Sequence, residues 1–401
     1  MAPLYQKLDI SALDAVLREM LPATDPGREE TSLTDGLGRI AAQTVPAPHN
    51  LPAMAVATMD GFCLGPDGGN DFHVIAQSVP GGTPPASPRP KEAVFVMTGG
   101  PVPKNTFGVT PREQVSVDGE HIRVNNNQAV KPMAAGTRTK AGAALVKAGE
   151  AIGPTQVAAL AEYGIWRLAV TPRPVVDLLA VGSEFGQMEA GEQGGQHNGN
   201  GPHLAALISL CGGQPSLLPP AADERAAISS AVAGCTAPLI ITTGGTAKGR
   251  FDLTAEAVAD AGFSWVIDGF NLRPGQSTRV ATRGNQILVS LPGSPGAMAS
   301  LFCLLIRPIL AHLSGTEASP APIHGRLATT VTNARRMPLL SAARVRVDDN
   351  GNISIIPDRD ATDGHVLLPE GNHPLTTGTV LPLFLAPNLN LANETCEPPE
   401  T

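Results

Sequence analysis

Residues 241–252, ITTGGTAKGRFD, combine the residue types that bind phosphate groups. Two successive glycines let the backbone approach a ligand closely and leave amide groups free at a turn. Hydroxyl groups and cations can complete such a site, and the start of a following helix favours negative charge. The candidate ligand-binding residues of this stretch are Thr243, Gly244, Gly245, Thr246, Lys248 and Arg250, and Asp252 is a candidate acid near the expected helix start.

This glycine turn has a purely structural alternative. The Gly-Lys-Ser/Thr order of a P-loop is absent. Glycines in a strand–turn–helix unit also serve tight packing of the helix against the sheet. A phosphate-binding role therefore needs support from elsewhere in the chain.

A second turn of this kind is LPGSPGA, residues 291–297. Gly293 keeps the backbone open, and Ser294 can cap a helix that begins with Pro295. A plain helix cap explains this turn equally well. Two anion-tolerant turns after neighbouring strands are more informative than either turn alone.

Several other polar residues follow predicted strands or turns. Asp60 precedes Gly61 in PAMAVATMDGFCL, where Asp-Gly indicates either a hairpin tip or an acid held at a loop end for chemistry. Glu184 follows the apolar run VVDLLAVG and is separated from it by Ser183. Thr98 lies in a glycine turn, Asn200 precedes a helix and Arg273 lies in LRPGQS. Asn200 could be only a helix cap, and Arg273 only a solvated loop charge.

The elements that must position these residues are strands alternating with helices. The runs RPVVDLLAVG, APLIITTGG and NQILVSLPG are buried-strand patterns that end in glycine turns, and segments with helical spacing come after them. Such alternation predicts a largely parallel sheet, whose ligands bind beyond the carboxyl ends of the strands. We therefore expect the three turns to converge.

The rest of the chain has other patterns. Residues 9–20 have helical spacing, and residues 31–45 predict a second helix interrupted by glycines. Short strands and turns fill residues 53–150, and an all-β region follows residue 317. The predicted fold is a multidomain α/β plus β protein.

Composition limits the functional class. The 401 residues carry a net charge of −8, which argues against a general nucleic-acid or membrane-surface binder. The five cysteines include no CxxC pair, which is typical of a reducing cytoplasm rather than a zinc or redox site. With no secretory apolar region at the N-terminus and no apolar run of about 18 residues, we expect a cytoplasmic protein without a membrane span.

Seven segments, in this order, resemble motifs of the molybdopterin molybdenumtransferase family, the MoeA proteins and the E domain of gephyrin. The family's lPpFdnSaMDGyA is similar to LPAMAVATMDGFC here, and its ImTGApvP to VMTGGPVP. Its TGdEL and DSN are similar to VGSEF and HNGNGPHL. Its TSGGvSvGxxD, KPGKP and GLPGNPvsa are similar to TTGGTAKGRFD, RPGQS and SLPGSPGAM. The resemblance covers nearly the whole chain.

The resemblance implies four domains. These are an extended linker module (1–50 and 141–172), a β-rich module (51–140), an α/β molybdopterin-binding domain with a parallel-rich sheet (173–316) and a C-terminal β-barrel (317–391). The polar composition of residues 392–401 predicts a loose tail. It also implies a homodimer whose cleft joins the α/β domain of one subunit to the β-rich module of the other.

The activity that the resemblance implies is insertion of molybdate into adenylylated molybdopterin, with release of AMP and help from Mg²⁺. Asp60, Glu184 and Asp252 would be the catalytic acids, and Asp60, delivered across the subunit boundary, and Asp252 would hold the metal. Pterin and phosphate would bind at Gly244, Gly245 and Thr246 and at the Gly293–Ser294 turn. Partners would be a second copy of the chain and a molybdoenzyme or another cofactor-biosynthesis protein.

The chain departs from the family pattern at several charged positions. Arg138 stands near the place of one family aspartate, Ser183 and Asn198 replace two further acids, and Arg273 and Gln276 replace two lysines. Ser294 and Ala57 replace an asparagine and a serine. The stretch TTGGTAKGRFDLTAEA also resembles the related molybdopterin adenylyltransferase branch. The alternatives are a non-catalytic paralogue that binds molybdopterin or the finished cofactor as a delivery or maturation factor, and an α/β protein with another nucleotide-like ligand.

Overall fold

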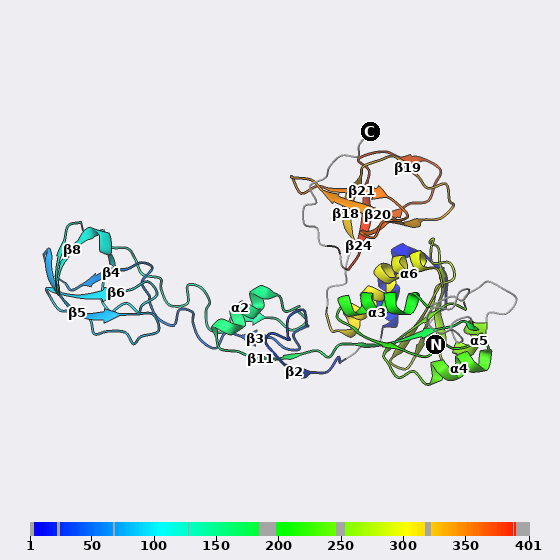
Figure 1. Cartoon of the computed structure of the whole chain (residues 1–401), viewed down its shortest axis with the longest axis horizontal. Helices are drawn as coiled ribbons and strands as arrows, with labels where there is room; N and C mark the ends of the chain where they lie inside the picture. The colour runs from blue at the N-terminus through cyan, green and yellow to red at the C-terminus, as the bar shows by residue number, and fades with distance from the viewer. Residues whose placement is uncertain are drawn as a thin grey trace, which may run out of the picture. The chain divides into compact units, whose positions relative to one another are not determined.

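The computed structural model describes residues 4–21, 25–66, 69–126, 128–183, 198–245, 253–316, 322–387 and 389. The chain divides into two units (Figure 1). The larger unit comprises Met1–Ala42, Gly149–Ile152 and Arg167–Thr401, and the smaller comprises Gln43–Ala148 and Gly153–Trp166.

A seven-stranded sheet forms the centre of the larger unit. Its strand order is β1 (Tyr5–Leu8), β15 (Ser264–Phe270), β16 (Arg279–Arg283), β17 (Gln286–Leu291), β14 (Leu239–Thr243), β12 (Val175–Ala180) and β13 (Gln214–Leu217). Strands β13, β12, β14 and β17 pair in parallel, as do β1 and β15, whereas β16 is antiparallel to both of its neighbours. The predicted parallel-rich sheet is confirmed.

Helices cover both faces of this sheet (Figure 1). On one face lie α1 (Leu13–Met20), preceded by the turn Ile10–Ala12, and also α3 (Asn200–Leu210), α6 (Pro295–Leu301) and α7 (Arg307–Leu313). On the other lie α4 (Arg225–Ala233) and α5 (Leu253–Asp260). Strand residues alternate between the two cores: Ile241 packs with the first helix group, and its neighbour Ile240 packs with the second. Burying each such side chain contributes about 1.5–3 kcal/mol.

The helical stretch from α6 to α7 contains a π-helical segment, Phe302–Ile306. Pro308 explains this irregularity, because its ring has no N–H and would clash with the carbonyl four residues earlier in a regular α-helix. By length and hydropathy the 19 residues Pro295–Leu313 could cross a membrane. However, 61% of the apolar window is buried within the protein, so the stretch packs here as a core helix.

A closed five-stranded barrel also belongs to the larger unit. Its order is β18 (Ile323–Leu327), β21 (Ile353–Pro357), β20 (Leu339–Val347), β22 (Gly364–Leu368) and β24 (Val380–Leu385), with β19 (Val331–Thr332) and β23 (Pro374–Leu375) as a separate pair. Val366 and Leu383 point into the barrel core, whereas Leu367 and Phe384 pack against the core of the α/β sheet. The expected C-terminal barrel is confirmed.

Buried His365 on β22 makes the stability of this unit depend on pH. Its side chain is 7% exposed, and its Nδ1 atom has no hydrogen-bond partner among the described residues. Burial lowers the pKa of His365 to about 4, because the charged form loses its hydration. In the unfolded chain the imidazole has its ordinary pKa of about 6.5. Between pH 6.5 and pH 4 the unfolded chain therefore binds a proton at His365 that the folded chain does not, and this favours unfolding.

We expect the free energy of unfolding to fall by about 3 kcal/mol as the pH drops from about 6.5 to about 4, and this contribution to level off below that. Urea unfolding at a series of pH values measures the slope. His365→Phe should remove this contribution. An unchanged slope in the variant would show that other groups cause the acid sensitivity.

The smaller unit is built on a six-stranded sheet. Its order is β7 (Thr110–Pro111), β4 (Gly61–Leu64), β6 (Glu92–Val96), β5 (Asp71–Ser78), β9 (His121–Val124) and β8 (Val115–Asp118), with the turn Arg112–Gln114 between β7 and β8. The unit also contains the pair β3 (Val45–Pro46) and β10 (Ala144–Val146) and helix α2 (Pro154–Glu162). The predicted β-rich character of this region is confirmed.

The helix predicted over residues 31–45 is wrong. The chain instead forms β2 (Glu29–Ser32), which pairs antiparallel with β11 (Arg167–Val170), followed by turns. The Ser32 hydroxyl donates a hydrogen bond to the Asp35 carboxylate (2.6 Å), and Gly38 has a φ of +75°. These features favour turns over helix, and the partner strand is too distant in the sequence for local spacing to reveal it.

Candidate active site

Three neighbouring parallel strands end at the same level of the central sheet. Ala180, the last residue of β12, pairs with Thr243 of β14, and Thr243 pairs with Leu291 of β17. Both Thr243 and Leu291 are also the last residues of their strands. The chain therefore leaves all three strands at one edge, and the predicted convergence of the glycine turns is confirmed. The turns that follow β12, β14 and β17 are called the first, second and third bend.

The central turn requires its two glycines. Gly244 has a φ of +86°, and a Cβ atom there would lie 2.3 Å from the backbone oxygen of Val181. Gly245 has a φ of +65°, and its Cβ would lie 2.3 Å from Thr254 Oγ1, which donates a hydrogen bond to the Gly245 carbonyl. Since real Cβ contacts are not this short, the close approach to the bend after β12 requires glycine at 244, and the close approach to Thr254 of α5 requires glycine at 245.

Asn200 connects helix α3 to the third bend. Its Nδ2 atom donates a 2.7 Å hydrogen bond to the carbonyl of Gly293, whose own missing Cβ would lie 3.7 Å from Gly244 Cα. Asn200 is the first residue of α3, and the N-cap position belongs to Gly199, so the helix-cap alternative for Asn200 is wrong. Ser294 does occupy the N-cap of α6, with Pro295 as the next residue, but its side chain makes no capping hydrogen bond.

An acid that sequence reasoning missed lies beside the first bend. The Ser183 amide donates to Asp223 Oδ2, and the Asp223 amide donates to Ser183 Oγ, both at 3.1 Å. Asp223 follows the edge strand β13, in which Pro215 obscures the strand pattern. The signal in the sequence that could have pointed to Asp223 is its place two residues before the start of α4. Asn198 is engaged locally, since its Oδ1 accepts a 3.0 Å hydrogen bond from the Gly201 amide.

Arg273 lies at the same edge of the sheet but farther along it. It follows β15, which runs in the same direction as β17, and its side chain is exposed. Its amide donates to the Pro338 carbonyl (3.0 Å), and its carbonyl accepts from the Leu340 amide (2.8 Å). The barrel loop just before Pro338 adds two exposed cations, Arg335 and Arg336. Sequence spacing gave no signal for this long-range neighbour.

Asp60 and Thr98 form a directly bonded pair in the smaller unit. Asp60 Oδ1 accepts hydrogen bonds from the Thr98 amide (2.7 Å) and from Thr98 Oγ1 (2.8 Å). These two bonds, the amide's above all, lower the pKa of Asp60, because they stabilise the charged carboxylate. The exposed side chain is thus held as an anion at the start of β4.

Gly61 settles the alternative reading of this Asp-Gly pair. Gly61 is the first residue of a strand and does not occupy a hairpin tip, and its φ is not positive. A Cβ at Gly61 would lie 2.2 Å from the Thr110 carbonyl oxygen. The glycine serves close strand packing, and the hairpin interpretation is wrong.

Five of the predicted site residues lie outside the described residues: Glu184, Thr246, Lys248, Arg250 and Asp252. The described part of the chain contains no cluster of three or more His, Cys, Asp or Glu side chains that could hold a metal ion. The bends offer glycine surfaces and the positioned Asn200 amide at one sheet edge, whereas the backbone amides of residues 181–183 in the first bend already donate to Thr243, Ala221 and Asp223. Glycine turns at the carboxyl ends of neighbouring parallel strands are typical of sites that bind phosphate groups.

Comparison with known protein families identifies the fold and its lineage. Residues 10–164 match the model of the MoeA N-terminal region (domains I and II), and residues 177–312 match that of a probable molybdopterin binding domain. The two matches follow one another and cover most of the chain. The chain belongs to the MoeA family.

Relatives of full length support this assignment. A MoeA relative from Staphylococcus epidermidis, a molybdopterin molybdenumtransferase, is 26% identical over 97% of this chain and 98% of its own length. The protein of that name from Staphylococcus aureus is 26% identical over 88% and 90%. Two crystal structures of a molybdopterin biosynthesis MoeA protein from Pyrococcus horikoshii share the fold. The first has a TM-score of 0.78 at 24% identity and covers 94% of this chain and 99% of its own. The second has a TM-score of 0.75 at 20% identity and covers 94% of this chain and 100% of its own.

Proposed function

We propose that this MoeA protein is a molybdopterin molybdenumtransferase, which inserts molybdate into adenylylated molybdopterin and releases AMP. The observation that carries the proposal is the in-register ending of β12, β14 and β17 in three bends, two of them with glycines at close approach. The full-length relatives named for this activity support it.

The bends would hold the pterin and its phosphates. Amides at Gly244 and Gly245 and at the Gly293–Ser294 turn would donate to ligand oxygens, while Asn200 fixes the Gly293 carbonyl. Thr243 and Pro295 border these bends. From outside the described residues, Thr246, Lys248 and Arg250 would add a hydroxyl and two cations that neutralise phosphate charge.

The reaction requires cleavage of the pyrophosphate bond between AMP and molybdopterin. A water oxygen adds to one phosphorus, the bridging P–O bond breaks, and two phosphate monoesters leave. Mg²⁺ would neutralise the developing charge, and it prefers one or two carboxylates together with phosphate oxygens and water. Asp60 fits this donor set, because Thr98 occupies Oδ1 and leaves Oδ2 without a hydrogen bond among the described residues. We propose Asp252 as the second carboxylate, and Glu184 as the acid that orients the water.

Molybdate is the second substrate and is a dianion. Arg273, Arg335 and Arg336 are exposed cations brought near one another by the hydrogen bonds between Arg273 and the barrel. Guanidinium groups bind tetrahedral oxyanions through paired hydrogen bonds. We propose that this group of arginines attracts molybdate to the same sheet edge. Asp223 would complete the acidic side of the site.

We further propose a cytoplasmic homodimer with the four domains and boundaries given above, in which the cleft combines the α/β domain of one subunit with the Asp60 module of the other. The proposed partners beyond the second copy are a molybdoenzyme or another cofactor-biosynthesis protein. The net charge of −8 argues against nucleic acids and membrane surfaces as partners.

A second candidate function is a paralogue that binds molybdopterin or the finished cofactor without turnover and delivers it to an enzyme. This candidate is favoured because two residues that stand in place of family acids have structural contacts here. Arg138, near the place of a family aspartate, forms an ion pair with Glu162, and Asn198 holds the start of α3.

One assay separates the two functions. The purified protein is incubated with adenylylated molybdopterin, Mg²⁺ and molybdate, and both AMP and active cofactor are measured. Release of AMP with formation of active cofactor supports the transferase. Tight pterin binding without AMP release supports the delivery protein, and the absence of any binding contradicts both.

Asn200→Ala should weaken pterin binding moderately. The change removes the hydrogen bond to the Gly293 carbonyl and frees the third bend, which costs about 1 kcal/mol or roughly a 5-fold rise in Kd. Fluorescence titration with molybdopterin measures the effect. Ser230→Ala on α4, an exposed position, is the matched control. Equal Kd values for both variants would exclude Asn200 from the site.

A further inference from the structure

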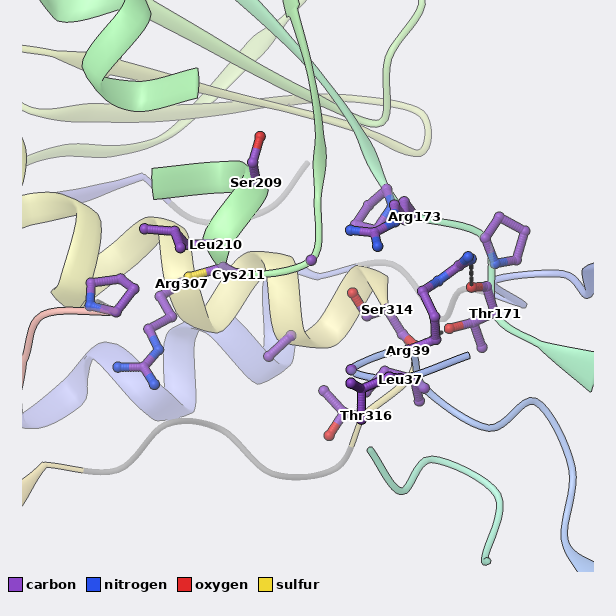
Figure 2. Close-up of a pocket in the computed structure, with 17 residues that line it drawn as sticks. Leu37, Arg39, Thr171, Arg173, Ser209, Leu210, Cys211, Arg307, Ser314 and Thr316 are labelled. Atoms are coloured by element: carbon purple, nitrogen blue, oxygen red, sulfur yellow. Dashed lines mark hydrogen bonds between the residues drawn. The ribbon is translucent and has the colours of Figure 1, made fainter. Parts of the chain in front are cut away.

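A cavity of about 430 Å³ lies at the opposite, amino-terminal edge of the central sheet. Pro174 directly precedes β12, and Gly212 leads into β13. Leu210, at the end of α3, and Ser314, after α7, complete the wall (Figure 2). The cavity is therefore separate from the candidate active site, which lies at the carboxyl ends of the same strands.

Three arginines line this cavity, and its described lining contains no Asp or Glu. Figure 2 shows Arg39 and Arg173 on one side, and Arg307 beside Cys211 on the other. Arg39 is neutralised by an ion pair with Glu29 and donates to the Thr171 carbonyl (2.8 Å). Arg307 donates a hydrogen bond to the backbone carbonyl of Leu385 (3.2 Å). Arg173 is exposed, and its side chain has no partner in the described part of the chain. The guanidinium groups of Arg173 and Arg307 thus have no carboxylate partner in the described part of the chain.

The chain itself reaches the mouth of the cavity. Pro387, just after β24, is one of the lining residues. The sequence that follows, residues 388–401, contains Glu394, Glu397 and Glu400, and no lysine or arginine. It also contains Cys396, nine residues beyond Pro387, a separation that an extended chain can bridge over about 30 Å. Cys211, a free thiol, lines the same cavity.

We propose that this cavity is a carboxylate-binding site whose occupant is the acidic segment 390–401 of the same chain. Glutamates of this segment pair with Arg173 and Arg307, and Cys396 comes within reach of Cys211. The sequence alone predicts a loose tail, because the acidic segment has too few apolar side chains to form a core. The uncompensated arginines supply the attraction that sequence patterns do not show.

Disulfide trapping tests the proposal on the full-length protein. Diamide at pH 8.5 takes two electrons and two protons from a thiol pair, which forms the disulfide while the diamide becomes a hydrazine. The alkaline pH is needed because burial raises the pKa of the Cys211 thiol. Non-reducing peptide mapping should identify a Cys211–Cys396 bond within one chain. Cys396 that stays reduced, or that pairs only between chains, would overturn the proposal.

Charge variants distinguish docking from mere proximity. The triple change Glu394→Gln, Glu397→Gln and Glu400→Gln lies outside the described fold and should slow disulfide formation about 5- to 10-fold. Arg173→Glu should slow it similarly. Arg346→Glu, on an exposed part of barrel strand β20, is the matched control and should leave the rate unchanged. Equal rates in all of these proteins would mean that the tail merely passes the cavity, which refutes a carboxylate site.

Discussion

Gly244→Ala should destabilise the larger unit by about 3 kcal/mol and weaken molybdopterin binding about 100-fold or more. The new Cβ atom would meet the Val181 backbone oxygen at 2.3 Å, and a φ of +86° is itself unfavourable for alanine. A backbone atom cannot move aside without displacing the end of β12, so the first and second bends must separate. Thermal unfolding and fluorescence titration with molybdopterin measure the two effects.

Gly284→Ala is the matched control for this change. Gly284 also has a positive φ, +57°, in the turn between β16 and β17, but no atom lies within 4 Å of the position that a Cβ would take there. Only the backbone strain of about 1 kcal/mol should remain, with unchanged pterin binding. If the two variants behaved alike, the close approach of the bends would have no role in the site.

Asp60→Asn should lower the rate of AMP release about 100-fold or more while leaving pterin affinity and thermal stability nearly unchanged. An amide oxygen can still accept both hydrogen bonds from Thr98, and the side chain is exposed, so the fold loses little. The change removes only the negative charge proposed to hold Mg²⁺. Steady-state AMP release at several Mg²⁺ concentrations measures the loss.

Two further variants sharpen this prediction. Asp118→Asn alters an exposed acid on β8 of the same sheet and should not change the rate. Thr98→Val removes the hydroxyl donor but keeps the amide donor, so the pKa of Asp60 should rise toward its ordinary value. The acid limb of the pH–rate profile should therefore move to higher pH. A full rate in Asp60→Asn would remove this residue from the mechanism.

The part of the site that sequence could predict is the part encoded locally. The runs before Gly182, Gly244 and Gly293 are strands buried at all but the first residue of β12 and of β17, and parallel alternation alone places their ends at one edge. The sequence motifs also single out Asp60 and Thr98, which the structure joins by two hydrogen bonds.

The remainder depends on contacts between distant segments. Strand β13 was missed because an edge strand tolerates Pro215, and Asp223 was missed with it. The helix predicted over residues 31–45 failed because β11 offers a strand partner more than a hundred residues away. The proximity of Arg335 and Arg336 to Arg273 arises from the barrel's position against the sheet, which no local pattern records.

Hydrogen exchange of backbone amides, with and without molybdopterin, tests most directly whether the three bends form the pterin site. Peptides that contain residues 181–183, 244–245 and 292–294 should all become protected together on binding, while peptides from the amino-terminal edge, residues 37–40 and 209–212, should not change. Protection confined to that opposite edge, or saturating pterin that protects none of the three bends, would contradict the account.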